Sequence, residues 1–146
     1  MTRPLTPREV FLKLVHGVSE GRWEELSDLY AEQTCVEHPF APLGAAPLRT
    51  RDELREHFSA GARMKPVRQR PAGIVVHETT DPEVIVAEFE YRGTADDGEP
   101  FTVPCVFVLR VRDGKIVASR DYIDHIASAR RRGRLGELAD ALRSSS

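Results

Sequence analysis

The sequence predicts an α+β domain in which helices come first and an antiparallel sheet follows. In the first part of the chain, apolar residues recur at helical spacing between capping signals and a glycine. After residue 66 the pattern changes to long extended segments separated by Asp-Gly pairs, which favour tight hairpin turns. Helices followed by hairpins indicate an α+β fold rather than alternating α/β units. The 146 residues suit one domain, which we expect over residues 1–143, with 144–146 as a disordered tail.

The first predicted helix has clear signals at both of its ends. Thr6 can cap it, Pro7 suits its first position, and Glu9 completes a capping box. Gly21 is placed to end the helix. The apolar residues between these two ends lie on one face of the helix: Val10, Phe11, Leu14, Val15 and Val18.

Two further helices and a short strand complete the first half of the chain. We predict a short helix over residues 23–31 and a strand over 33–40, which Pro39 closes. A third helix begins at Thr50, where residues 50–53 repeat the capping-box pattern. The inner face of this helix would carry Leu54, His57, Phe58 and Gly61.

The second half of the chain predicts four strands, over residues 67–78, 83–94, 99–112 and 115–126, and then a helix over residues 127–142. The third of these strands is apolar on both faces, so one face meets the helices and the other needs separate cover. A second copy of the chain is the simplest cover, and we therefore expect a homodimer through the outer face of the sheet. Pro104 cannot donate a hydrogen bond to a neighbouring strand, so we expect a bulge there that bends the sheet around a cavity.

The composition excludes several classes of protein. Lys+Arg number 21 and Asp+Glu 23, a balance that lacks the basic footprint of a nucleic-acid-binding protein. No apolar run is long enough to span a membrane, and the N-terminus lacks a signal-peptide pattern, so we expect a cytoplasmic protein. Cys35 and Cys105 stand far apart, and the histidines lack metal-ligand spacing. We therefore expect no disulfide, metal or cofactor.

Several motifs together resemble those of one superfamily. At the beginning they are Gly21-Arg22-Trp23, Leu29-Tyr30-Ala31 and Val36-Glu37-His38-Pro39; later they are Phe89-Glu90-Tyr91, Asp113-Gly114-Lys115-Ile116-Val117 and Arg120-Asp121-Tyr122-Ile123-Asp124. They resemble NTF2-like proteins of the SnoaL-like, ketosteroid isomerase and limonene epoxide hydrolase kinds. The resemblance runs from residue 8 to residue 126. It implies a cone of three N-terminal helices packed on a strongly curved, antiparallel or mixed sheet, with a C-terminal helix.

Asp121 and His38 are the candidate catalytic residues. The resemblance to limonene epoxide hydrolases implies that Asp121 lies in the pocket as an acid–base group. The resemblance to the isomerases, whose motif is Val-Glu-Asp-Pro, implies that His38 stands where their catalytic base is. In an apolar pocket a carboxylate has a raised pKa and an imidazole can stay neutral, so the two could transfer protons. The alternatives are an exposed or paired strand carboxylate and a histidine that only bonds the backbone.

The sequence also departs from both groups of enzymes. The isomerases' tyrosine on the first helix corresponds to Leu14, and their second aspartate falls near Phe107, so steroid isomerisation by their mechanism is not expected. The hydrolases' remaining aspartate and arginine would fall at Glu88 and Glu90. Strand alternation argues against even that match, because the inner face of this strand would carry Ile85, Ala87 and Phe89.

Other residues could complete the pocket. Strand alternation places Ser119 and Ile123 on the same face as Asp121. His57 and His125 could reach the cavity, whereas a buried filler role is expected for Cys105. The arginine run 130–134 is followed by acidic residues, which favours a solvated helix face. The expected substrate-binding residues are Leu14, Tyr30, Phe58, Met64, Phe89, Phe107, Leu109, Ser119 and Ile123, and Trp23 could join them.

The leading functional prediction is a cofactor-free acid–base enzyme that acts on a small molecule. It would be an isomerase, cyclase or dehydratase (a lyase) in biosynthesis, acting on a polyketide- or terpenoid-like intermediate. The alternative is a non-catalytic NTF2-like domain that binds a ligand or a partner, and a third possibility is an epoxide hydrolase. An enclosed cavity lined by both His38 and Asp121 would favour the enzyme.

Overall fold

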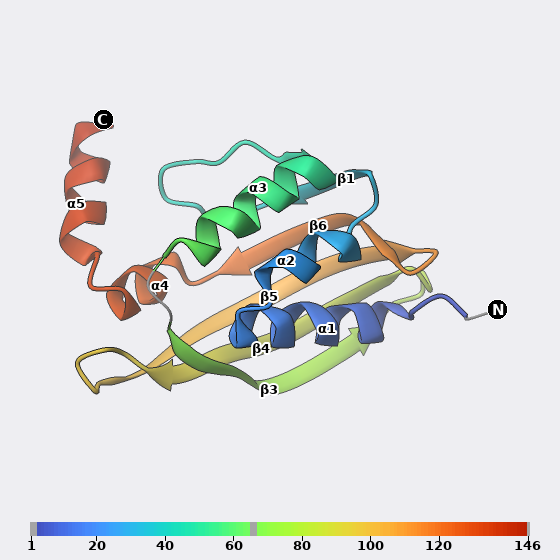
Figure 1. The fold of residues 1–146 in the computed structure, drawn as a ribbon, viewed down its shortest axis with the longest axis horizontal. Coiled ribbons are helices and arrows are strands. Elements are labelled where there is room, and N and C mark those ends of the chain that lie inside the picture. Colours follow the sequence, from blue (N-terminus) through green and yellow to red (C-terminus); the bar gives the residue numbers. More distant parts are fainter. Residues whose placement is uncertain (1–2, 65–66, 146) are drawn as a thin grey trace.

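The computed structural model of the chain describes residues 3–64 and 67–145. Its helices are α1 (Pro7–Glu20), α2 (Trp23–Leu26), the 3-10 helix η1 (Ser27–Leu29), α3 (Arg51–Ala62), α4 (His125–Arg131) and α5 (Leu135–Ser144) (Figure 1). Its strands are β1 (Gln33–Glu37), β2 (Leu48–Thr50), β3 (Arg68–Glu78), β4 (Val84–Thr94), β5 (Pro100–Arg112) and β6 (Lys115–Ile123).

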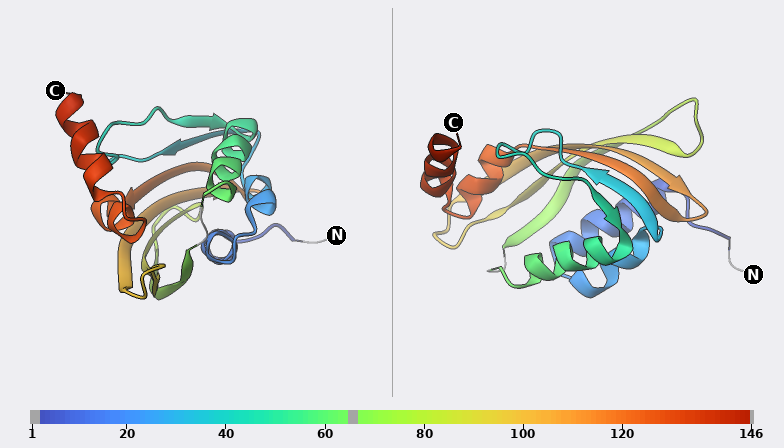
Figure 2. Two further views of the ribbon diagram at one scale, coloured as in Figure 1. Left: turned by 60° about the vertical axis from the view of Figure 1, so that its left-hand side comes forward. Right: turned by 90° about the horizontal axis from the view of Figure 1, so that it is seen from above.

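The strands form one curled, six-stranded sheet in the order β2-β1-β6-β5-β4-β3, which does not close into a barrel. All neighbours are antiparallel except β1 and β6, which are parallel, so the sheet is mixed. Figure 2 shows α1, α2 and α3 on one side of the sheet, with α4 and α5 at one end. The predicted α+β fold, with helices on a curved sheet, is confirmed.

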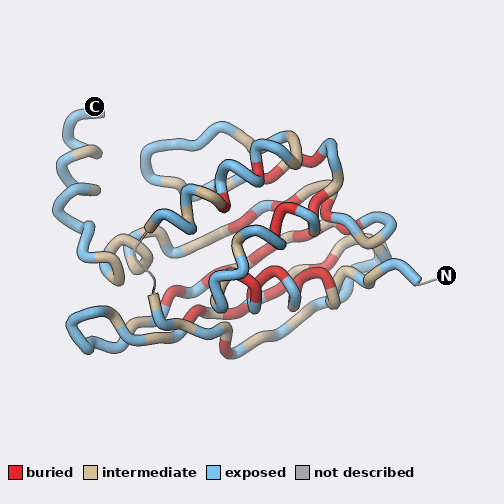
Figure 3. The backbone as a smooth tube through the Cα atoms, in the orientation of Figure 1, coloured by how far each residue is buried: buried red, intermediate tan, exposed pale blue. Residues whose placement is uncertain are grey.

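Helix α1 packs across the inner face of the sheet and contributes its apolar side to the hydrophobic core. Glu9 N donates to Thr6 Oγ1 at 3.2 Å, Thr6 N donates to Glu9 Oε1 at 3.0 Å, and Gly21 ends the helix in the left-handed conformation with φ 71°. The apolar face of α1 packs on the inner face of β3, β4 and β5. Buried residues concentrate on α1 and on the central strands β4 and β5 (Figure 3). The Phe11 ring meets Phe89 edge-on at 5.2 Å and Phe107 at 6.3 Å. These contacts fix α1 across the sheet.

The region after α1 differs from the prediction in three details. The second helix is only one turn long and continues as η1. Strand β1 ends at Glu37, two residues before Pro39, which was expected to close it. The three-residue strand β2 was not predicted because it is too short to show alternation. Thr50 caps α3 as expected, but Glu53 Oε1 accepts the N–H of Arg49 at 3.1 Å instead of completing a capping box.

The C-terminal region is two helices instead of the predicted single one. Strand β6 ends at Ile123 rather than 126, because Asp124 caps α4 by accepting the Ala127 N–H at 2.9 Å. Gly133, with φ 67°, then separates α4 from α5. Helix α5 includes Ser144, where the disordered tail was predicted to begin; Ser145 is its C-cap residue and residue 146 lies outside the described residues.

The expected bulge at Pro104 is absent, and the sheet has register shifts elsewhere. Pro104 pairs in regular register with Glu90 of β4. Its carbonyl accepts the N–H of Asp124 at 3.0 Å, so this edge of Pro104 faces the end of β6. The N–H that proline lacks would point to the same side, where the hydrogen bonds between β5 and β6 stop. The register shifts among the described strands lie between Gln33 and Val36 of β1, between Ala72 and Val75 of β3, at a glycine, and between Arg110 and Val111 of β5.

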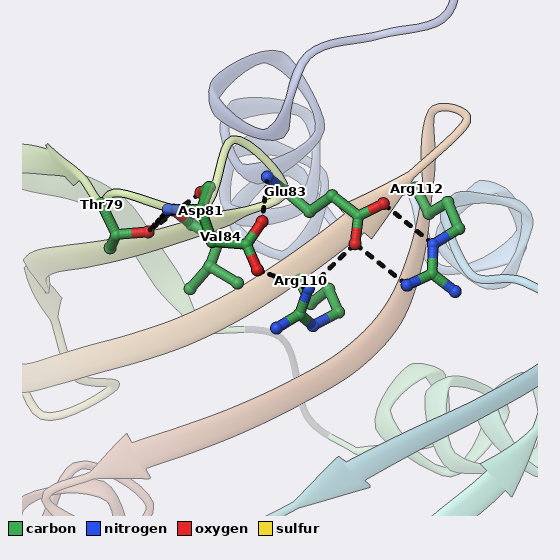
Figure 4. Close-up of polar contacts among 6 residues, drawn as sticks. All are labelled: Thr79, Asp81, Glu83, Val84, Arg110 and Arg112. Atoms are coloured by element: carbon green, nitrogen blue, oxygen red, sulfur yellow. Dashed lines mark hydrogen bonds and ion pairs between the residues drawn. The ribbon is translucent and has the colours of Figure 1, made fainter.

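Asp81 and Glu83 of the turn from β3 to β4 pair with Arg110 and Arg112 at the end of β5, and we call these four residues the surface ion cluster (Figure 4). Arg110 Nη1 lies 2.9 Å from both Asp81 Oδ2 and Glu83 Oε1. Arg112 Nε lies 2.9 Å from Glu83 Oε2. The cluster therefore links the beginning of β4 to the end of β5.

The outer face of the sheet was predicted to pair two copies of the chain. Val106 and Val108 of β5 lie on this face and are only half-buried. Pairing through this face stays a prediction. Among the described residues, no helix has the length and apolar character that a membrane crossing needs.

Candidate active site

Strand β6 carries Asp121 on its inner face. Its Cα pairs with that of Phe107 on β5, in the sequence of alternating inward positions that also includes Ser119. Asp121 is only 7% exposed, and Ser119, itself 2% exposed, donates its hydroxyl hydrogen to Asp121 Oδ1. The Asp121 carboxyl group is thus buried on the inner face of the sheet, where it accepts a hydrogen bond from the Ser119 hydroxyl.

The parallel pairing of β1 with β6 brings His38 beside this carboxylate. Val36 pairs with Ser119 and Glu37 with Arg120, so the next residues along the two strands are His38 and Asp121. Their side chains approach until His38 Nε2 lies 3.9 Å from Asp121 Oδ2. That distance is too long for a direct hydrogen bond, but one oxygen atom of a ligand could bond to both groups.

Burial shifts the pKa values of both groups toward their uncharged forms. It raises the pKa of Asp121 from 3.8 to about 7, although the hydrogen bond from Ser119 opposes this change. Burial, and after it the positive charges that His57 and His125 can carry, lower the pKa of His38 from 6.5 to about 4. Near neutral pH, His38 is therefore a neutral imidazole and Asp121 exchanges between acid and base.

Other polar groups surround this pair. The His57 ring of α3 lies 5.8 Å from the His38 ring. Burial also keeps Tyr30 a neutral phenol, because it raises the pKa of that group well above 10, and the charge of Asp121 raises it further. Burial likewise raises the pKa of Tyr91 on β4. The two phenols can therefore donate hydrogen bonds at any physiological pH.

His38 and Asp121 both line one cavity of about 690 Å³ between the sheet and the helices. Of the predicted substrate-binding residues, six line it: Leu14, Tyr30, Phe58, Met64, Phe107 and Ile123. Trp23 joins them and stacks on Phe58, with ring centroids 6.5 Å apart. His57 and His125, which the sequence left open, also line it.

Three predicted lining residues do not reach this cavity. Leu109 is fully buried in the core, where it belongs to the same cluster of residues as Val10 and Phe11 of α1. Phe89 is enclosed by the rings of Phe11, Phe107 and Tyr91 at 5.0–5.2 Å. Ser119 bonds to Asp121 instead of lining the cavity. Strand alternation predicts correctly which residues lie on the inner face of the sheet, but it does not predict which of them line the cavity and which are packed in the core.

Glu88 and Glu90 do not line the cavity either. They lie on the other face of β4, as the alternation predicts: Glu88 Oε2 bonds to His77 Nε2 at 2.5 Å, and Glu90 Oε1 accepts from Arg92 Nε at 2.6 Å. The glutamates therefore do not supply the second carboxylate that an epoxide hydrolase would need near Asp121.

The C-terminal helices close one end of the cavity, a role that the sequence did not predict. Residues of α4, α5 and the link between them line it: Ser128, Ala129, Arg131, Arg132, Arg134, Glu137, Leu138 and Ala141. The expectation of a solvated face is wrong for Arg131, which packs at 5.8 Å over the Phe101 ring and donates from Nη1 to Gln69 Oε1 at 2.6 Å. The helical spacing of Leu138 and Ala141 was the one available signal for this side.

The arrangement has the parts of a proton-transfer site. A carboxyl group with a pKa of about 7 can take a proton and return it at neutral pH with little free-energy cost in either direction. The neutral imidazole and the phenols can donate hydrogen bonds to a ligand oxygen. The remaining lining is mostly aliphatic and aromatic, which suits an apolar small molecule.

Comparison with known proteins agrees with this architecture. A Bacillus subtilis protein provisionally named an isomerase is 21% identical, and the match covers 88% of this chain and 93% of that protein with a TM-score of 0.76. A Pseudomonas putida KT2440 protein provisionally named a polyketide cyclase is 19% identical over 87% and 98% of the two chains (TM-score 0.67). The epoxide hydrolase/cyclase-like enzyme SalBIII, described with a role in pyran ring formation in polyether salinomycin, is 16% identical over 80% and 89% (TM-score 0.62).

At these identities the structural likeness shows a shared fold alone. The search of curated proteins gave no significant match. The sequence itself matches the SnoaL-like domain over residues 11–119, which is more than half of the chain. This chain therefore belongs to the SnoaL-like family, as its resemblance to NTF2-like proteins predicted.

Proposed function

We propose that the protein is a cofactor-independent enzyme that moves a proton within an apolar, oxygenated small molecule, with Asp121 as the acid–base group. The observation that carries the proposal is the burial of Asp121 beside His38 at the wall of a cavity of about 690 Å³. Isomerisation, cyclisation and dehydration all begin with such a proton transfer. A polyketide- or terpenoid-like intermediate would suit the apolar lining.

In the proposed step, ionised Asp121 takes a proton from a carbon beside a carbonyl group. The electron pair of the broken C–H bond moves toward the carbonyl oxygen, which becomes an enolate. Neutral His38, together with the phenol of Tyr30, would stabilise this oxygen by donating hydrogen bonds. Where a carbon–carbon double bond is conjugated with the enolate, the electron pair extends over that bond, and Asp121 then returns the proton to its far carbon, so that no other reactant is needed. His38, with its pKa near 4, is the hydrogen-bonding partner rather than the base.

A non-catalytic binding domain fits these observations less well. A passive pocket has no need of a buried carboxyl group with a pKa of about 7. Epoxide hydrolysis also has less support, since among the described residues no arginine lies within 4.0 Å of an Asp121 oxygen.

The proposal is tested by hydrogen–deuterium exchange at carbon. The enzyme is incubated in D₂O with cyclic ketones of increasing size, such as cyclohexanone, 2-indanone and 2-tetralone, and exchange beside the carbonyl is followed by NMR. We expect Asp121→Asn to reduce the enzyme-catalysed rate by about 100-fold or more. The rate should rise with pH and level off above about 7, as the carboxyl group ionises.

The matched control is Asp113→Asn, in the exposed turn between β5 and β6, where φ is 51° and asparagine is equally suited. This variant should exchange the ketones at the wild-type rate. Equal rates for wild type and Asp121→Asn with every ketone would contradict the proposal.

A further inference from the structure

The end of the cavity formed by α4 carries two buried polar atoms that lack partners. Arg131 Nε and His125 Nε2 are both shielded from solvent, and neither has a hydrogen-bond partner among the described residues. Both side chains line the same cavity as Asp121. An unsatisfied buried donor costs about 1–3 kcal/mol, and more when it is charged, so such a group usually has a partner in the protein, in an ordered water or in a bound molecule.

Arg131 also differs from the other arginines at this end of the cavity. Arg134 Nε lies 3.8 Å from Glu137 Oε2, which offsets its charge. Within the described part of the chain, no carboxylate lies within 4.0 Å of Arg131, whose contacts are the neutral Gln69 amide and the Phe101 ring. Burial and the neighbouring Arg132 lower its pKa only to about 10, so it keeps its positive charge at neutral pH.

We infer that Arg131 binds an anionic oxygen group of the substrate, such as a carboxylate, with His125 as a second, uncharged partner. The ligand would then extend between two poles of one cavity: its anionic group at α4 and its reacting carbon beside Asp121. The substrate class is accordingly an apolar carbon skeleton that carries both a carbonyl group and an acidic group. This inference deepens the proposed function and rests on it for the reacting end alone.

The geometry of the fold supports this orientation. Arg131 contacts Gln69 of β3 and the Phe101 ring at the beginning of β5, whereas Asp121 lies on β6 beside His38. In the strand order, β6 and β3 stand on opposite sides of β5, so Arg131 and Asp121 meet the cavity from different parts of the sheet. A carboxylate at Arg131 would neutralise a buried cation. Arg131 would therefore position the substrate and contribute to its affinity, while the proton transfer stays with Asp121.

The inference is tested by calorimetric binding of two probes that differ only in charge, 2-naphthoate and 2-naphthamide. Wild-type protein should bind the carboxylate more tightly than the amide by about ten-fold or more, the strength of a charge-assisted hydrogen bond. Arg131→Met should remove this preference and leave the affinity for the amide nearly unchanged. Arg131→Lys, which keeps the charge, should retain part of the preference.

The matched control is Arg130→Met, because Arg130 is exposed on the same helix and does not line the cavity. It should bind both probes as wild type does. Equal wild-type affinities for the two probes, or an equal loss of both in Arg131→Met, would overturn the inference.

The two proposals fail separately. Asp121→Asn should keep the preference for naphthoate, since the positive pole is unchanged, while it loses ketone exchange. Naphthoate preference without any exchange in wild-type protein would contradict the proton-transfer proposal alone. Exchange without that preference would contradict the role of Arg131 alone.

Discussion

The surface ion cluster and the cavity use the same kinds of charged side chain in opposite ways. In the cluster, pairing with Arg112 and Arg110 lowers the pKa of Glu83 to about 2, so the carboxylate is permanently charged. In the cavity, burial raises the pKa of Asp121 to about 7, with one hydroxyl donor as compensation. In the surface ion cluster, paired and hydrated charges link two strands. In the cavity, the desolvated carboxyl group can gain or lose a proton near neutral pH.

The largest expected effect is on the free energy of unfolding, and it results from the burial of Asp121. Because its pKa is about 7 in the folded protein and 3.8 as a reference value, the folded state holds the proton more tightly between these pH values. Stability therefore falls as the pH rises from 3.8 to 7, by about 4 kcal/mol in total. We expect Asp121→Asn to recover up to about 4 kcal/mol of unfolding free energy at alkaline pH. Urea denaturation at a series of pH values measures this gain.

The turn variant Asp113→Asn again serves as the control and should leave the stability curve almost unchanged, because its side chain is exposed. A destabilised Asp121→Asn at alkaline pH would show that the carboxylate is well solvated, as in the surface ion cluster, and the contrast between the two regions would then be lost.

The next largest effect on stability is expected from His38, and its dependence on pH runs in the opposite direction. Its pKa is lowered from 6.5 to about 4, so the unfolded state binds the proton more readily and stability falls as the pH drops through this range. The change amounts to about 3 kcal/mol. The slopes from His38 and Asp121 oppose each other in wild-type protein. His38→Gln should therefore leave stability falling with rising pH, and Asp121→Asn should leave it falling with decreasing pH.

The same urea titrations measure both slopes. Parallel curves for wild type and His38→Gln would mean that His38 is protonated alike in the folded and unfolded states, and its assignment as a buried neutral imidazole would have to be abandoned.

The smallest effect is expected in the surface ion cluster itself. Arg110→Gln removes the partner of Asp81 and Glu83, yet all three side chains are accessible to water, which screens their interaction. We expect a small loss of thermal stability that shrinks at high salt and disappears as the pH falls from 4.5 toward 2, where Glu83 becomes protonated. Scanning calorimetry measures the change, and Arg8→Gln, at an exposed position of α1, is the control. A loss larger than the pH effect of Asp121 would reverse the ranking of the two regions.

Sequence reasoning recovered the parts of this fold that depend on local periodicity. The alternation on β6 places Ser119, Asp121 and Ile123 on one face, and the capping box places the beginning of α1 at Thr6, as the structure has them. The resemblance to NTF2-like proteins added the pairing of His38 with Asp121, which no local pattern contains. It depends on a parallel contact between two strands near opposite ends of the sequence.

The missed features depend on the final packing of distant elements. Phe89 and Leu109 have the same alternation as true lining residues, and only the position of α1 decides that they belong to the core. Arg131 stands in an arginine run that reads as a solvated surface, and its burial depends on how α4 turns back against β5. Burial of a charged residue cannot be predicted from its neighbours in sequence when the covering element is distant.

The parallel pairing of β1 and β6 also determines when the site can exist. A contact between remote parts of a chain forms late in folding, since a long loop must close before the contact stabilises it. The antiparallel hairpins of β3 to β6 can form from neighbouring segments, but they hold Asp121 without its histidine. A slip of one residue between β1 and β6 would turn His38 to the outer face and leave every hairpin intact. The chemistry of this small domain is therefore as cooperative as its fold, because the reactive pair is complete only when β1 and β6 have paired.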